Sequence, residues 1–255
     1  MMTIKAITYG KDPLQTADLY VPTTSNGAAV VFVHGGAWLR GDKTDGQNLA
    51  EVLAQAGYLV AAINYRLAQA ALFPAAQSDL ETFITWFKAS DYQQLRLGLL
   101  GVSVGGTMAL TAAFKFHLPV VTWSAVVESA NWMATHQNVK PALDAKKTLG
   151  LAKPRAIKDA FYRYFIENYL GTVTSDKLQA LDPLQATGAE LPAVMMFNST
   201  DEIVPLGDAL TFLNRLTARQ PNSRLTVFSG DGHAQAYEAR ALGQTLAFFD
   251  QQLQG

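Results

Sequence analysis

The sequence has no cysteine among its 255 residues. Disulfide bonds, thiolate nucleophiles and cysteine-ligated zinc sites are therefore excluded. An excess of charge of one sign is also missing, because 20 lysines and arginines balance 21 acidic residues and the formal net charge is −1. Without a basic stripe to release counterions, we expect no nucleic-acid partner and no binding to an anionic membrane surface.

Long hydrophobic runs are absent as well. Apolar segments such as LPVVTWSAVV at 118–127 are too short to cross a bilayer as a helix. The first ten residues, MMTIKAITYG, contain no apolar core of signal-peptide length. We therefore expect a soluble, cytoplasmic protein, an expectation that a leader removed before residue 1 would overturn.

Motifs for metals and phosphates are missing too. The four histidines are scattered, and neither an H-x-x-x-H pattern nor an acidic cluster has the spacing of metal ligands. No G-K-[ST] sequence follows the glycine-rich segments, which argues against a nucleotide phosphate loop. The sequence therefore predicts no metal site and no cofactor.

Apolar strands alternating with amphipathic helices are what the sequence does contain. Near-continuous apolar runs are typical of strands that are covered on both faces of a parallel sheet. The pattern predicts an α/β fold, with a doubly wound, mostly parallel sheet, helices on both faces, and one domain over 1–255. The expected strands lie at 28–33, 59–65, 95–102, 118–127, 191–199 and 224–230, and the expected helices at 46–57, 77–89, 205–219 and 237–253.

The segment from about 129 to 181 interrupts this alternation. It has no convincing strand, it has a helical pattern, and it is rich in aromatic residues. Such an insertion commonly covers a site, so we expect a small helical cap whose Trp132 contributes to a substrate pocket. The alternative is that its aromatic residues only pack the segment onto the body of the protein, and both can hold together.

A serine between glycines stands where a strand gives way to a helix. The sequence Gly101-Val102-Ser103-Val104-Gly105 matches G-x-S-x-G, the nucleophile elbow, in which a sharp turn exposes the serine hydroxyl. Bulky residues two positions away would clash in such a turn, which explains the glycines. A glycine-rich turn with an incidental serine is the structural alternative, but the flanking strand and helix favour Ser103 as a nucleophile.

A serine nucleophile needs a base, and His233 is the best of the four histidines. It lies in the loop GDGHAQ, which follows a strand and opens the last helix, so it belongs to the same edge of the sheet as Ser103. We expect His117 to cap a helix or lie on the surface, His136 to lie in the cap, and His34 to hold a glycine loop through hydrogen bonds.

The base in turn needs a carboxylate that fixes its tautomer. Asp201 directly follows the strand at 191–199, and the order Ser103, Asp201, His233 is the one expected for a triad built on this kind of sheet. Its neighbour Glu202 is the rival. We favour Asp201, because it is nearer to the strand end and its shorter side chain suits a tight loop, although an aspartate there is also a common helix cap.

When a serine attacks a carbonyl carbon, the carbonyl oxygen becomes negatively charged, and this oxyanion needs hydrogen-bond donors. The segment HGGAW at 34–38 follows the first strongly apolar strand, and its glycines allow backbone N–H groups to approach a substrate closely. We expect an oxyanion hole formed by the N–H groups of Gly35, Gly36 and Val104. Trp38 then either forms a wall of the pocket or only packs beneath it.

These segments resemble the α/β-hydrolase superfamily, and within it the hormone-sensitive-lipase-like esterases and small carbohydrate-ester esterases. HGGAW, NYRLAQAALFPAAQSDL, GVSVGG, STDEIVP, GDGHAQ and the opening ADLYVP carry the resemblance over nearly the whole chain except the cap-like segment. Two departures are present. Ala37 replaces a third glycine, a variant similar to that of arylformamidases, and Gln69-Ala70 stand where a proline and an acid are common.

The resemblance implies an α/β-hydrolase fold and a cofactor-independent serine carboxylesterase. The short, aromatic cap segment favours short-chain acyl esters of small molecules over the substrates of a true lipase. An arylformamidase or another small amide hydrolase would use the same triad and remains an alternative. A non-catalytic ligand-binding homologue is a second one, which the presence of Ser103, Asp201 and His233 disfavours.

Overall fold

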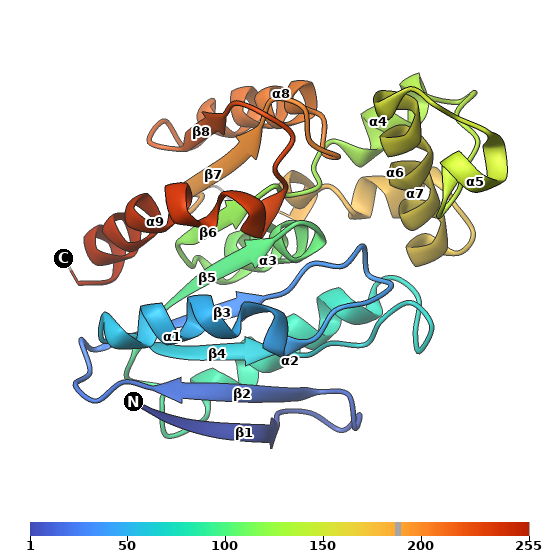
Figure 1. Cartoon of the computed structure of the whole chain (residues 1–255). Coiled ribbons are helices and arrows are strands. Elements are labelled where there is room, and N and C mark those ends of the chain that lie inside the picture. Colours follow the sequence, from blue (N-terminus) through green and yellow to red (C-terminus); the bar gives the residue numbers. More distant parts are fainter. Residues whose placement is uncertain (187–189, 255) are drawn as a thin grey trace.

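The computed structural model describes residues 1–186 and 190–254, and its centre is an eight-stranded sheet (Figure 1). The strands are β1 (Met2–Thr8), β2 (Thr16–Val21), β3 (Ala28–Val33), β4 (Leu59–Ile63), β5 (Arg96–Val102), β6 (Val120–Trp123), β7 (Val194–Ser199) and β8 (Arg224–Phe228). They are ordered β1-β2-β4-β3-β5-β6-β7-β8. Only β2 runs antiparallel to its neighbours β1 and β4, so the prediction of a mostly parallel sheet is confirmed.

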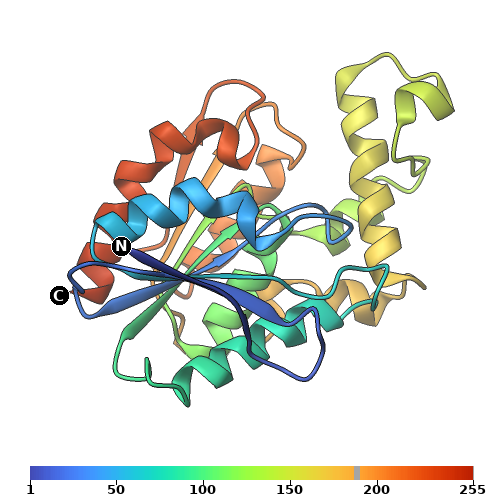
Figure 2. The same ribbon diagram turned by 60° about the horizontal axis from the view of Figure 1, so that its bottom comes forward.

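Helices cover both faces of the sheet, as Figure 2 shows. The helices that flank it are α1 (Gln47–Gln55), α2 (Ala75–Lys88), α3 (Val104–Phe116), α8 (Leu206–Thr217) and α9 (Glu238–Leu253). Val30 and Phe32 of β3 belong to the core beneath α1 and α9, whereas Val31 and Val33 belong to the core beneath α2, α3 and α8. Both sets of alternating side chains are buried, which explains why the central strands are apolar throughout.

Two strands, β1 and β6, differ from the expectation. β1 was not anticipated from the sequence, because it is a partly exposed edge strand without an apolar run. β6 covers only Val120–Trp123 of the apolar run at 118–127, because the backbone turns into the left-handed region at Ser124, with φ 56°. The apolar residues that follow Ser124 are buried in the core, but they do not pair with a neighbouring strand.

In the described part of the chain, four α-helices lie between β6 and β7: α4 (Ser129–Thr135), α5 (Ala145–Leu149), α6 (Pro154–Leu170) and α7 (Ser175–Ala180). In Figures 1 and 2 they form a lobe beside the sheet, with α6 the longest of them. Trp132, Tyr162 and Tyr169 are buried in the same core as α2 and α3, so these aromatic residues anchor the lobe to the body. Three short 3₁₀ helices, η1 (Lys43–Gly46), η2 (Pro183–Ala186) and η3 (Ala234–Tyr237), complete the described elements.

Candidate active site

Ser103 occupies a strained turn between β5 and α3. Its backbone angles, φ 54° and ψ −127°, are unusual for a residue with a side chain, and its N–H donates a 2.8 Å hydrogen bond to the Trp123 carbonyl. A Cβ on Gly101 would lie 2.3 Å from the Gly105 carbonyl oxygen, and one on Gly105 would lie 2.3 Å from the Val33 carbonyl oxygen. The predicted sharp elbow, with glycines required on both sides, is therefore confirmed.

His233 lies in the loop between β8 and η3, as predicted, and its Nδ1 is hydrogen-bonded to Glu202 Oε2. A carboxylate can only accept, so Nδ1 carries the hydrogen and Nε2 is left as a basic nitrogen. Glu202 is 1% exposed, and its second oxygen accepts a 2.7 Å hydrogen bond from the Ser199 N–H. The carboxylate is therefore held rigidly behind the imidazole.

The choice of Asp201 as the partner of the histidine was wrong. Its carboxylate is exposed and accepts a hydrogen bond from the neighbouring Thr200 hydroxyl, 2.8 Å away. The turn after β7 is fixed by the Asp201 N–H, which donates to the Gly230 carbonyl at 2.9 Å, and it directs residue 202 inward and residue 201 outward. Glutamate has the extra methylene needed to reach His233 from that position.

Side chains other than Glu202 also hold the histidine loop. Ser124 Oγ accepts a 2.9 Å hydrogen bond from the Ala234 N–H and lies 2.7 Å from the Tyr237 hydroxyl. Ser199 Oγ donates to the Gly232 carbonyl. These roles carry no local sequence signal, because the partners are more than a hundred residues apart in one case and thirty-three in the other.

The HGGAW loop lies directly against Ser103. A Cβ on Gly35 would be 2.9 Å from Ser103 Cβ, and Gly36 has a φ of +101° that suits only glycine. Val104 is the first residue of α3, so its N–H has no acceptor within the helix. Three candidate N–H groups thus belong to backbone that surrounds Ser103.

His34 holds this loop, as expected. Its Nδ1 is 2.8 Å from the Gly35 carbonyl oxygen, and its ring stacks on Tyr65 with the centroids 4.2 Å apart. The Tyr65 hydroxyl donates to the carbonyls of both His34 and Gly35, at 2.9 and 3.1 Å. Burial lowers the pKa of His34, which keeps the ring neutral with Nδ1–H as the donor.

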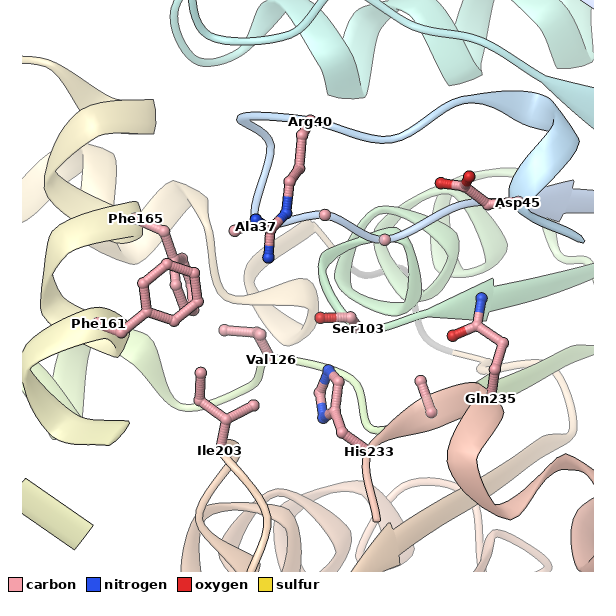
Figure 3. A pocket seen from close by; sticks show the side chains of 13 residues that line it. Ala37, Arg40, Asp45, Ser103, Val126, Phe161, Phe165, Ile203, His233 and Gln235 are labelled. Atoms are coloured by element: carbon pink, nitrogen blue, oxygen red, sulfur yellow. The ribbon is translucent and has the colours of Figure 1, made fainter. Parts of the chain in front are cut away.

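Ser103 and His233 face one cavity of about 250 Å³ (Figure 3). Among the described residues no hydrogen bond joins the two side chains, and such contacts are often long in enzymes without substrate. One part of the wall is apolar and another part is polar. The apolar side chains are Val126, Phe161, Phe165 and Ile203, and the polar ones are Arg40, Asp45 and Gln235.

The two tryptophans expected in the pocket lie behind it. Trp38 is fully buried and stacks on Tyr169 with the centroids 4.2 Å apart, and Trp132 stacks on His136 at 4.3 Å. Large aromatic rings gain most from complete burial, so they pack the lobe onto the body. Phe161 and Phe165 of α6 line the cavity in their place, one helical turn apart.

The remaining histidines have the places expected of them. His117 ends α3 in the left-handed conformation and is exposed, and His136 lies at the end of α4 in the helical lobe. Within 1–186 and 190–254, no three histidine, cysteine or acidic side chains are grouped so that they could hold a metal ion. No helix in that part of the chain has the length and apolarity needed to cross a membrane.

The sheet order, the serine elbow after β5 and the histidine loop after β8 together define an α/β-hydrolase. The chain belongs to the BD-FAE family, whose model matches residues 17–216. The match begins in β2 and ends in α8, so it includes the HGGAW loop, the elbow and Glu202.

Curated relatives cover much of the chain at low identity. The isoprenylcysteine alpha-carbonyl methylesterase of Arabidopsis thaliana is 26% identical over 246 residues, which cover 91% of this chain but 57% of that protein. The kynurenine formamidase of Meyerozyma guilliermondii is 35% identical over 112 residues, 43% of this chain and 42% of that one. The chain therefore spans little more than half the length of the methylesterase.

Solved structures support the fold. Esterase B from Lactobacillus rhamnosis superimposes with a TM-score of 0.71 at 19% identity, covering 98% of this chain and 87% of that one. A truncated carbohydrate esterase from gut microbiota gives a TM-score of 0.70 at 17% identity, covering 100% of this chain and 97% of that one.

Proposed function

We propose that this protein is a serine ester hydrolase that acts on small-molecule esters with short acyl groups. The observation that carries the proposal is that Ser103, on its elbow, and His233, backed by Glu202, open into the same cavity. The family match and the esterase and methylesterase names of similar proteins support the same chemistry.

The mechanism follows from the atoms available. His233 Nε2 removes the proton of Ser103 Oγ as the oxygen attacks the ester carbonyl carbon. The carbonyl oxygen becomes an oxyanion, which the N–H groups of Gly35, Gly36 and Val104 stabilise. When the C–O bond to the alcohol breaks, the imidazolium gives its proton to the leaving alkoxide, and Ser103 is left acylated.

Water completes the cycle by the same route. His233 takes a proton from a water molecule, the hydroxide adds to the acyl carbon, and the second tetrahedral intermediate collapses. The carboxylic acid leaves, and Ser103 recovers its proton from the imidazolium. Throughout, Glu202 keeps Nδ1 protonated and stabilises the positive charge that forms on the ring.

The size of the cavity supports short acyl groups. About 250 Å³ lies at or below the lower end of the usual range for small-molecule sites, which begins at roughly 300 Å³. Phe161 and Phe165 of α6 form part of the wall, so we assign this helix to the cap that bounds the acyl group.

The test is steady-state hydrolysis of p-nitrophenyl esters of increasing acyl length by the wild-type protein and by Ser103→Ala. The proposal predicts turnover that is greatest for short esters and that falls by several powers of ten in the variant. Slow hydrolysis that survives Ser103→Ala would contradict it.

A second candidate, hydrolysis of a formamide, is favoured by one observation. The formamidase relative is 35% identical to this chain, although over less than half of it. The same triad would attack a formyl carbonyl and protonate an amine leaving group. Comparing phenyl formate and acetate with formanilide and acetanilide distinguishes the two, because faster turnover of the anilides would displace the ester assignment.

A further inference from the structure

Arg40 is a cation on the wall of the catalytic cavity, and its side chain is unpaired among the residues that the structure describes. Its side chain makes no hydrogen bond or ion pair with any residue in 1–186 or 190–254, although it helps to line the cavity that contains Ser103. Arg66, Arg155, Arg163 and Arg215, by contrast, are each paired with a carboxylate.

The backbone directs Arg40 toward the reacting groups. The N–H groups of Leu39 and Arg40 both donate to the Gly36 carbonyl, at 3.0 and 3.1 Å, so the chain turns back tightly after the glycine loop. A Cβ on Gly36 would lie 2.0 Å from the Arg40 carbonyl oxygen, which shows how closely the two segments pack. In Figure 3 the guanidinium extends from this turn into the space in front of Ser103.

The other charged group on this side of the cavity, Asp45, makes no ion pair with Arg40 in the described part of the chain. Asp45 lies farther along the same loop, and its Oδ2 accepts a 3.0 Å hydrogen bond from the Asp42 N–H at the start of η1. The third polar side chain, Gln235, carries no charge. The guanidinium is therefore available to an anion that enters the cavity.

We propose that Arg40 selects esters that carry a carboxylate close to the scissile bond. This inference rests on the proposed function, because it concerns the substrate of the same site. A guanidinium presents a planar fork of N–H donors that matches a carboxylate, and such charge-assisted bonds are stronger than neutral ones. The apolar residues on the other side of the cavity accommodate the uncharged part of the ester.

The carboxylate can belong to the acyl group or to the alcohol, and paired substrates separate these cases. For the acyl side, mono-p-nitrophenyl adipate is compared with its methyl ester. For the alcohol side, p-acetoxybenzoate is compared with methyl p-acetoxybenzoate. In each pair, the quantity measured is the ratio of kcat/KM for the anionic ester to kcat/KM for the neutral ester.

The variants are Arg40→Gln, Arg40→Lys and a matched control, Arg96→Gln. Arg96 is an exposed arginine at the beginning of β5, the strand whose other end leads to Ser103. The control makes the same change in net charge at the opposite end of β5, away from Ser103. It therefore reports any effect of overall charge on anionic substrates.

We expect Arg40→Gln to lower the anionic-to-neutral ratio about tenfold for one of the two pairs, since the side chain is exposed and partly screened. Arg40→Lys should recover part of the ratio, Arg96→Gln should leave it unchanged, and added salt should reduce the preference of the wild type. An unchanged ratio in Arg40→Gln for both pairs, while hydrolysis still depends on Ser103, would overturn the role of Arg40. Absence of Ser103-dependent hydrolysis of every ester would instead overturn the proposed function.

Discussion

Replacing Glu202 by glutamine removes the negative charge that faces His233 and little else. The glutamine side chain has nearly the same shape, and its oxygen can still accept the hydrogen bond from the Ser199 N–H. Its amide group can, however, donate to Nδ1 and stabilise the wrong tautomer of the histidine. The imidazolium that forms in each transition state would also lose its counter-charge.

Burial sets the size of the effect. Because Glu202 is 1% exposed, water screens its interaction with His233 very little. Exchanging the carboxylate of a Ser-His-Asp triad for its amide lowers kcat about 10⁴-fold, so we expect a loss of roughly 1,000-fold to 10,000-fold in kcat for Glu202→Gln. Asp201→Asn is the matched control at the neighbouring exposed carboxylate, and we expect its kcat to stay within about threefold of the wild type.

The assay is kcat for p-nitrophenyl acetate hydrolysis by both variants, with thermal unfolding as the control for folding. A large loss in Glu202→Gln with near-normal turnover in Asp201→Asn is the expected result. If Asp201→Asn lost as much activity as predicted for Glu202→Gln, and Glu202→Gln retained most of it, the assignment of the carboxylate would be refuted.

Three further changes test other parts of the structure. Gly105→Ala places a Cβ 2.3 Å from the Val33 carbonyl oxygen, so we expect a loss of about 3 kcal/mol or more in the free energy of unfolding, measured in urea; wild-type stability would contradict the tight elbow. Burial and the nearby Glu128 raise the pKa of Asp208 to about 7, so the folded protein holds this proton more tightly than the unfolded chain. Stability should therefore fall as pH rises from about 4 to 7, and Asp208→Asn should flatten this part of the profile of Tm against pH; an equally steep profile in the variant would argue against it. Phe161→Ala widens the cavity wall and should shift the preferred p-nitrophenyl ester to longer acyl chains, whereas an unchanged chain-length profile would remove Phe161 from the acyl site.

The interior of the fold was predictable because its strands are buried on both faces. Residues 28–33 are all buried in β3, and an unbroken apolar sequence of this length is typical of a parallel strand that is covered on both faces. β1 lies at the edge of the sheet and is largely exposed, so its sequence carries no comparable pattern. Its pairing with β2 depends on tertiary contacts that periodicity does not encode.

The candidate site was predictable where backbone geometry restricts the residue type. The elbow at Ser103 admits only glycine on either side, and that restriction is visible as a motif. The difference between Asp201 and Glu202 depends on which of two adjacent side chains a turn directs inward, and the hydrogen bonds that decide it come from residues about thirty positions away.

The pocket walls were the least predictable part. Trp38 and Phe161 are both aromatic, so the sequence does not indicate which of them lines the cavity. The packing of α6 over the HGGAW loop buries Trp38 and places Phe161 in the cavity wall. Arg40 carried no sequence signal at all, because an arginine in a loop is ordinary. Its importance depends on the cavity beside it and on the absence of a carboxylate partner among the residues that the structure describes.

The most direct measurement of the central claim is peptide mapping by mass spectrometry after treatment with an alkyl fluorophosphonate. Ser103 Oγ would displace fluoride from phosphorus and keep the phosphonyl group. We expect one adduct per chain, located on Ser103, with hydrolysis of p-nitrophenyl acetate lost in proportion to labelling. Complete loss of hydrolysis with the adduct on another residue, or full activity with Ser103 labelled, would contradict it.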